Sequence, residues 1–203
     1  MTTAAHAETH HHEQHGPPAP HYSSGMKPET LGMYLFIGSE IMLFGSFFAA
    51  YFFVRVVNGT PWPTPPYELP VFVAAINTAI LMTSSATMHW ATVSIKKGNV
   101  WGMRAGLVLT FLMGLSFLIS QLYEYMRAGF NTSDGAFPTI FLCLTGLHGC
   151  HVFIGLTLLL FMTVRAFRGH FSAEHHHGVE IAGIYWHFVD VMWIVVFATV
   201  YLL

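Results

Sequence analysis

Charged side chains are scarce in this chain. Asp, Glu, Lys and Arg make up 9% of its 203 residues, against about 25% in a typical soluble domain. The formal net charge is −2, so the composition provides no basic surface for nucleic acid. Cysteine is also rare, because Cys143 and Cys150 are the only two. They lie seven residues apart in one apolar segment, so we expect neither a disulfide nor a metal pair between them.

No secretory signal is visible, because the first apolar stretch begins only after about 30 polar residues. Residues 1–30 are rich in His, Pro, Thr and Ala, a composition typical of a disordered tail. The histidines of this tail are more consistent with a solvated segment than with a metal site; they are His6, His10, His11, His12, His15 and His21.

Long apolar runs dominate the rest of the chain, in which hydrophobic residues reach 54% of the total. Each run exceeds the ~20 residues needed to cross ~30 Å of hydrocarbon, and only helices satisfy every backbone group there. The sequence therefore predicts an all-α membrane protein with a single five-helix transmembrane domain over residues 31–203. The predicted spans are 31–57, 69–95, 102–126, 137–167 and 179–203.

The distribution of basic residues predicts how the bundle is oriented. Arg55 and Arg127 fall on one side of the predicted membrane. Six basic residues fall on the side of the N-terminal tail: Lys27, Lys96, Lys97, Arg104, Arg165 and Arg168. Basic residues accumulate on the cytoplasmic side of membrane proteins. We therefore expect a cytoplasmic N-terminus and a C-terminus outside.

Small residues at four-residue spacing predict two places where helices approach closely. Gly45 with Ala49, and Gly102 with Gly106, have this spacing, which allows backbones to come together in membranes. Glycine is common in membrane helices, so the pattern alone is weakly specific.

Glu40 lies nine residues into the first predicted span, in the motif Ser39-Glu40-Ile41-Met42-Leu43-Phe44. A carboxylate in hydrocarbon is costly unless it has a partner, and such groups mark proton relays or contacts between subunits. A protonated acid hydrogen-bonded inside the bundle is an equally good interpretation. The residues alone leave both open.

His187 and Asp190 stand three residues apart, inside Tyr185-Trp186-His187-Phe188-Val189-Asp190-Val191-Met192-Trp193 of the fifth span. Residues at this spacing share one helix face. We expect a hydrogen bond between them, which would fix the imidazole orientation. A structural polar contact is the better interpretation, although catalysis stays open.

His148 and His151 also share a face, in the fourth span. Together with His89 and His187 they raise the question of a bis-histidine haem, which needs two ligands at matching depth. No pair has clearly matched depth along its span, so we predict no haem, copper or non-haem iron site. Glu124, at the outer end of the third span, is either a solvated helix end or a specific contact.

Basic and imidazole side chains gather where the fourth span ends. Arg165 can bind a lipid phosphate through two guanidinium N–H groups, although from the residues alone an ordinary positive-inside anchor is the better interpretation. The connection that follows is crowded with titratable residues: His170, Glu174, His175, His176, His177 and Glu180.

Taken together, these motifs resemble subunit III of the haem–copper terminal oxidases, in particular that of bacterial cytochrome c oxidases. The resemblance covers residues 31–203, in the family's order and spacing, and matches the five-span form that lacks the first two of seven spans. It rests on the Glu40 motif, Tyr123-Glu124-Tyr125, Thr145-Gly146-Leu147-His148-Gly149-Cys150-His151-Val152, His175-His176 with Gly178 and Glu180, and the 185–193 motif.

The resemblance implies an accessory subunit without haem or copper, because those cofactors belong to subunits I and II of an aa3- or caa3-type oxidase. It implies a multi-pass protein of the bacterial cell membrane that packs on subunit I, supports proton uptake and binds phospholipid. Glu40 resembles the family's carbodiimide-reactive carboxylate. The other expected partners are subunit II, small subunits and a respiratory supercomplex. The residues at the lipid site would be Arg165, His170, His175 and His176.

Three other interpretations are weaker. Subunit III of a quinol oxidase shares the five spans, and its electron donor is set by subunit II. A five-span membrane haem b cytochrome would need the histidine ligands discussed above. A transporter would be expected to show inverted repeats and broken helices, which an odd number of spans without an obvious repeat does not suggest.

Overall fold

The structure is a computed structural model, which describes residues 27–59, 62 and 69–203. Five long helices, each long and apolar enough to cross a membrane, make up this part of the chain. They are α1 (Pro28–Asn58), α2 (Val71–Lys96), α3 (Val100–Arg127), α4 (Ala136–Phe167) and α5 (His177–Phe197). A short 3₁₀ turn (η1, Thr132–Asp134) precedes α4, and a π-helical turn (η2, Ala198–Leu202) ends α5.

These helices confirm the predicted all-helical, five-span fold. The first helix begins at Pro28, three residues before the predicted span, because proline is well suited to a first helical turn where its missing N–H costs nothing. The tail histidines from His6 to His21 lie outside the described residues.

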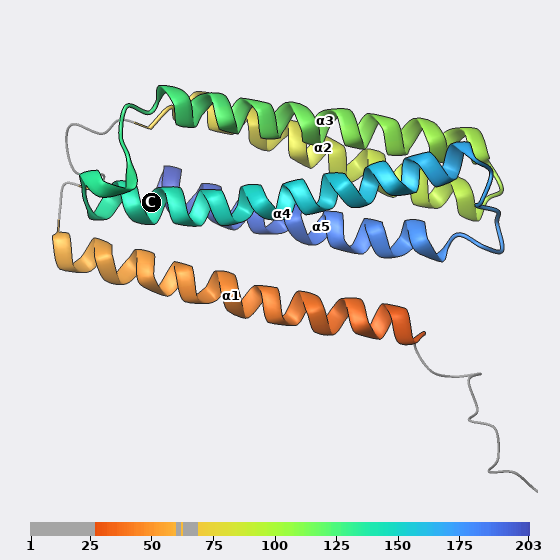
Figure 1. Cartoon of the computed structure of the whole chain (residues 1–203), viewed down its shortest axis with the longest axis horizontal. Coiled ribbons are helices and arrows are strands. Elements are labelled where there is room, and N and C mark those ends of the chain that lie inside the picture. Colours follow the sequence, from red (N-terminus) through yellow and green to blue (C-terminus); the bar gives the residue numbers. More distant parts are fainter. Residues whose placement is uncertain (1–26, 60–61, 63–68) are drawn as a thin grey trace, which may run out of the picture.

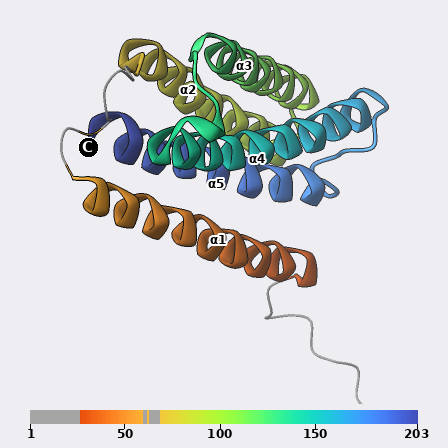
Figure 2. The same ribbon diagram turned by 60° about the vertical axis from the view of Figure 1, so that its left-hand side comes forward.

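Four of the helices form a bundle, and α1 lies along one side of it. Helix α2 packs on α3 and α5, α4 packs on α3 and α5, and α1 packs on α4 and α5. Figure 1 and the turned view in Figure 2 both show α1 next to α4 and α5, with α2 and α3 on the opposite side. Helix α1 is the least buried span and α5 the most buried.

The core is built around two indoles of α5, Trp186 and Trp193, which are both fully buried. Glycines on α3 and α4 make room for Trp186: a Cβ atom at Gly155 would lie 3.0 Å from its ring, and one at Gly114 would overlap it. Trp186 Nε1 donates to Ser84 Oγ at 3.0 Å, so its polar atom is satisfied although the ring is buried.

The turn between α2 and α3 shows how local sequence fixes a close helix pair. Gly98 has φ +77°, a left-handed conformation that favours glycine. Its N–H bonds Ile95 O at 2.9 Å, and Asn99 N–H bonds Ser94 O at 2.9 Å, which is the Schellman pattern of a helix end. The Asn99 side chain then caps α3 by accepting from Gly102 N–H at 2.9 Å.

One of the two predicted small-residue contacts is confirmed. A Cβ atom at Gly106 would lie 2.7 Å from the Ala91 side chain, so the backbones of α2 and α3 approach closely here. At Gly45 an added Cβ would meet nothing within 4 Å among the described residues, so this position makes no close helix contact within the chain. Gly45 lies on α1, whose small residues face away from the bundle.

The helix ends fall into two groups, one at each end of the bundle. The basic end contains the start of α1, the α2–α3 turn and the α4–α5 connection, and Arg104 Nε donates there to Ala166 O at 3.1 Å. The far end contains the end of α1 and the last residue, since Arg55 donates to the carbonyl of Leu203. The start of α1 and the end of α5 therefore lie at opposite ends of the bundle, as an odd number of spans requires.

Candidate functional site

A buried acid and imidazole join α1 to α4 near the middle of the bundle. Glu40 Oε2 lies 2.8 Å from His151 Nε2, and both side chains are largely shielded, with relative exposures of 16% and 7%. The Phe44 ring covers the imidazole, with a centroid distance of 4.9 Å. The sequence indicated that Glu40 needs a partner but did not pair it with His151.

The hydrogen bonds of His151 fix how many protons the pair holds. Its Nδ1 lies 2.8 Å from Leu147 O, and a carbonyl oxygen only accepts, so Nδ1 carries a hydrogen. One further proton therefore lies between Nε2 and the Glu40 carboxylate. Whether it sits on nitrogen or on oxygen, the pair has no net charge. This is how the fold accommodates an acid in a low-dielectric interior.

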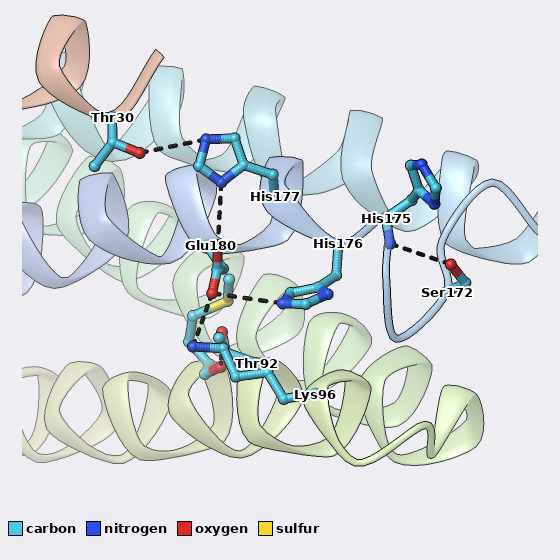
Figure 3. A network of polar contacts seen from close by, with 9 residues as sticks. Thr30, Thr92, Lys96, Ser172, His175, His176, His177 and Glu180 are labelled. Carbon is cyan, nitrogen blue, oxygen red and sulfur yellow. Dashed lines mark hydrogen bonds and ion pairs between the residues drawn. The ribbon is translucent and has the colours of Figure 1, made fainter. Parts of the chain in front are cut away.

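A second polar network lies at the basic end and centres on Glu180 of α5 (Figure 3). Lys96 Nζ from the end of α2 lies 2.7 Å from Glu180 Oε1. His177 Nδ1 lies 3.2 Å from Glu180 Oε2, and His176 Nε2 lies 3.6 Å from Oε1. One carboxylate thus joins α2 to the first turn of α5.

The same network extends to α1. Thr30 Oγ1 lies 3.3 Å from His177 Nε2, and Glu29 Oε2 lies 3.9 Å from that nitrogen. Figure 3 shows the His177 ring between Thr30 and Glu180. Helix α1 is therefore attached by polar contacts at its start, at its middle through Glu40, and at its end through Arg55.

The predicted hydrogen bond between His187 and Asp190 is not formed. His187 Nδ1 instead lies 2.6 Å from Ser85 Oγ on α2. Neither carboxylate oxygen of Asp190 has a hydrogen-bond partner among the described residues, although the side chain is buried. The imidazole of His187 thus bonds a side chain of another helix, which spacing along α5 does not reveal.

The two histidines of α4 have different surroundings despite their shared face. His148 is fully buried, with its ring 4.9 Å from Trp193 and 5.8 Å from Phe117. Neither of its nitrogens has a hydrogen-bond partner in the described part of the chain. His148 therefore faces α3 and α5, whereas His151 faces α1.

His89 and His187 line one cavity of about 250 Å³ at the basic end, beside Glu180. These two histidines therefore lie near one another, which their positions along the chain did not indicate. Across residues 27–59, 62 and 69–203, no three His, Cys, Asp or Glu side chains are grouped to hold a metal ion. Cys143 and Cys150 are free thiols on the exposed surface, which confirms that they form no disulfide with each other.

The residues of the predicted lipid site surround the end of α4. The Arg165 guanidinium carbon lies 5.8 Å from the Phe161 ring and 5.3 Å from the Phe171 ring. No carboxylate forms an ion pair with Arg165 among the described side chains. His170 and His175 are exposed, and the backbone N–H of His175 donates to Ser172 Oγ at 3.1 Å.

The fourth residue of that predicted site, His176, is turned toward Glu180 instead (Figure 3). At the opposite end, Glu124 is half-buried near the end of α3 and lines a cavity of about 430 Å³. One of its oxygens is buried without a hydrogen-bond partner in the described structure. Glu124 is therefore not a simple solvated helix end.

Comparison with known proteins gives a consistent result. The family model described as cytochrome c oxidase subunit III matches residues 8–203. A protein of Thermostichus vulcanus named cytochrome c oxidase subunit 3 is 45% identical over 175 residues, which cover 86% of this chain and 87% of the relative. Proteins of the same name from Drosophila melanogaster and Loxodonta africana are 41% and 40% identical, each covering 84% of this chain and 67% of the relative.

Proposed function

On the premise that this chain belongs to the cytochrome c oxidase subunit III family, we propose that it is the accessory third subunit of an aa3- or caa3-type oxidase of a bacterial cell membrane. It packs on subunit I, while haem and copper are held by subunits I and II. The names of its relatives favour cytochrome c over quinol as the electron donor. Oxygen reduction and proton pumping belong to the whole complex.

The contribution of this chain to proton uptake rests on the Glu40–His151 contact. This is a shielded pair at 2.8 Å that shares one proton. Such a pair holds an ionisable group in hydrocarbon without net charge. It can exchange its proton with a neighbouring group without the desolvation cost of an isolated charge. We assign Glu40 a supporting role, because its carboxylate is paired with the imidazole of His151 within this chain.

Replacing Glu40 with glutamine tests this role in the assembled oxidase. Glutamine keeps a donor that can reach His151 Nε2, so we expect normal assembly, oxygen consumption close to wild type and a modest slowing of proton uptake in proteoliposomes. Glu174→Gln is the matched control, since Glu174 is exposed in the α4–α5 connection. Loss of all oxygen reduction in an assembled Glu40→Gln complex would falsify the supporting role.

The lipid site is proposed at the end of α4. Arg165 has no carboxylate partner within the described part of the chain and is flanked by two aromatic rings. These rings hold a guanidinium in place while leaving its N–H groups free for a phosphate. His170 and His175 are exposed on the adjoining connection. His176 contributes by fixing Glu180 rather than by facing the headgroup.

The test compares Arg165→Ala with Arg168→Ala, because Arg168 is an exposed arginine one turn away. We expect Arg165→Ala to release a phospholipid, counted by mass spectrometry of the purified complex, and to shorten the working life of the oxidase during turnover. Arg168→Ala should retain both. An unchanged lipid content and an unchanged working life of the oxidase in Arg165→Ala would refute the proposed lipid site.

A further inference from the structure

A cavity of about 430 Å³ lies at the far end of the bundle, between the start of α2 and the end of α3. Its volume is within the range of ~300–1,000 Å³ found for small-molecule sites. It is lined by Ser120, Tyr123, Glu124 and Arg127 of α3 and by apolar side chains that include Phe130 and Phe141. It lies at the opposite end from the Arg165 site.

The cavity carries one acidic and one basic group that do not neutralise each other. Glu124 and Arg127 are three residues apart on α3, close enough along a helix to interact, but no ion pair joins them in the described structure. Arg127 is held instead over the Tyr123 ring, with its guanidinium carbon 4.6 Å from the centroid. One oxygen of Glu124 is buried and has no hydrogen-bond partner among the residues that the structure describes.

A third polar group of the cavity is oriented by α2. Ser120 Oγ accepts a hydrogen bond from Asn77 Nδ2 at 2.9 Å, so its own hydroxyl hydrogen is available to donate. A site with a carboxylate that lacks a donor, a free guanidinium and a hydroxyl donor is complementary to a ligand with both an ammonium and a phosphate. Phe130 and Phe141 add buried apolar surface suited to a hydrocarbon portion.

We propose that this cavity binds a phospholipid with a primary ammonium headgroup, that is, a phosphatidylethanolamine. Glu124 accepts from the ammonium, while Arg127 and Ser120 donate to the phosphate. The position at helix ends of a membrane bundle matches the depth of lipid headgroups. An anionic headgroup such as glycerol phosphate has no cation for Glu124, and a quaternary ammonium has no N–H to satisfy its buried oxygen.

The experiment uses the purified oxidase, stripped of lipid in detergent and reloaded with phosphatidylethanolamine, phosphatidylcholine or phosphatidylglycerol of the same acyl chains. Native mass spectrometry counts the lipids retained. We expect about a tenfold preference for phosphatidylethanolamine over phosphatidylglycerol at one site, because a tenfold difference in affinity is about what one additional charge-assisted hydrogen bond contributes. Glu124→Gln should reduce this preference to within about twofold, and Arg127→Gln should weaken retention of both zwitterionic lipids.

Two controls keep this site distinct from the one at α4. Arg165→Ala should leave the preference unchanged, and Glu174→Gln should behave as wild type. Retention of the subunit on the complex shows that each variant has folded. Equal retention of the three lipids, an unchanged preference in Glu124→Gln, or a protein segment in the cavity by electron cryomicroscopy would each overturn the proposal.

Discussion

Replacing Glu40 with leucine leaves His151 Nε2 without a partner in a shielded environment, and replacing His151 with leucine does the same to the carboxyl group. Leaving one buried polar partner unsatisfied costs about 1–3 kcal/mol. Replacing both residues with leucine leaves two apolar side chains and no unsatisfied polar group, so the effect on stability can be nearly neutral. We therefore expect the double variant to be more stable than either single variant, with a coupling energy of about 1–3 kcal/mol.

This coupling can be measured as detergent-induced loss of the subunit from the purified complex. A coupling of ~1.4 kcal/mol corresponds to a tenfold difference in the dissociation equilibrium. Ser39→Ala is the matched control, because Ser39 is exposed and its hydroxyl donates to Phe36 O of its own helix, at 2.6 Å. Additive effects of the two leucine substitutions, within about 0.5 kcal/mol, would refute the pairing argument.

Two further predictions concern α5. We expect Gly114→Ala to impair recovery of the complex, because the new methyl group would overlap Trp186. Gly146→Ala should be neutral, since an added Cβ meets nothing within 4 Å. The amount of the subunit in purified membranes distinguishes the two variants, and equal yields would contradict the packing around Trp186. His187→Ala should lower the thermal stability of the complex by leaving a hydroxyl of α2 without its imidazole partner. Wild-type melting of this variant would show that the contact contributes nothing.

The spans were predictable because each is a local property. About 20 apolar residues suffice to cross the bilayer, and only a helix satisfies the backbone there. The turn at Gly98 and Asn99 is likewise determined by residues that are adjacent in the sequence. The six basic residues assigned to the side of the N-terminal tail also fall at one end of the bundle, which follows from their positions at alternate span ends. The side of the membrane they face stays a prediction.

The polar contacts were not predictable in the same way, because each joins residues far apart in the chain. Glu40 and His151 are 111 residues apart, and Ser85 and His187 are 102 apart. The sequence showed that Glu40 and His187 needed partners, since unsatisfied polar groups are costly in hydrocarbon. The nearest candidate along α5, Asp190, was wrong because the competing hydroxyl comes from α2.

The sequence alone therefore determined the number of helices, their approximate limits and the family resemblance, since these depend on composition and short motifs. Only the tertiary structure decided that α1 lies at the side of the bundle, that Glu40 shares a proton with His151 and that Glu124 and Arg127 face one cavity unpaired. The physical reason is that lipid and protein interior are similarly apolar, so the hydrophobic pattern of a membrane helix says little about which face meets its neighbours.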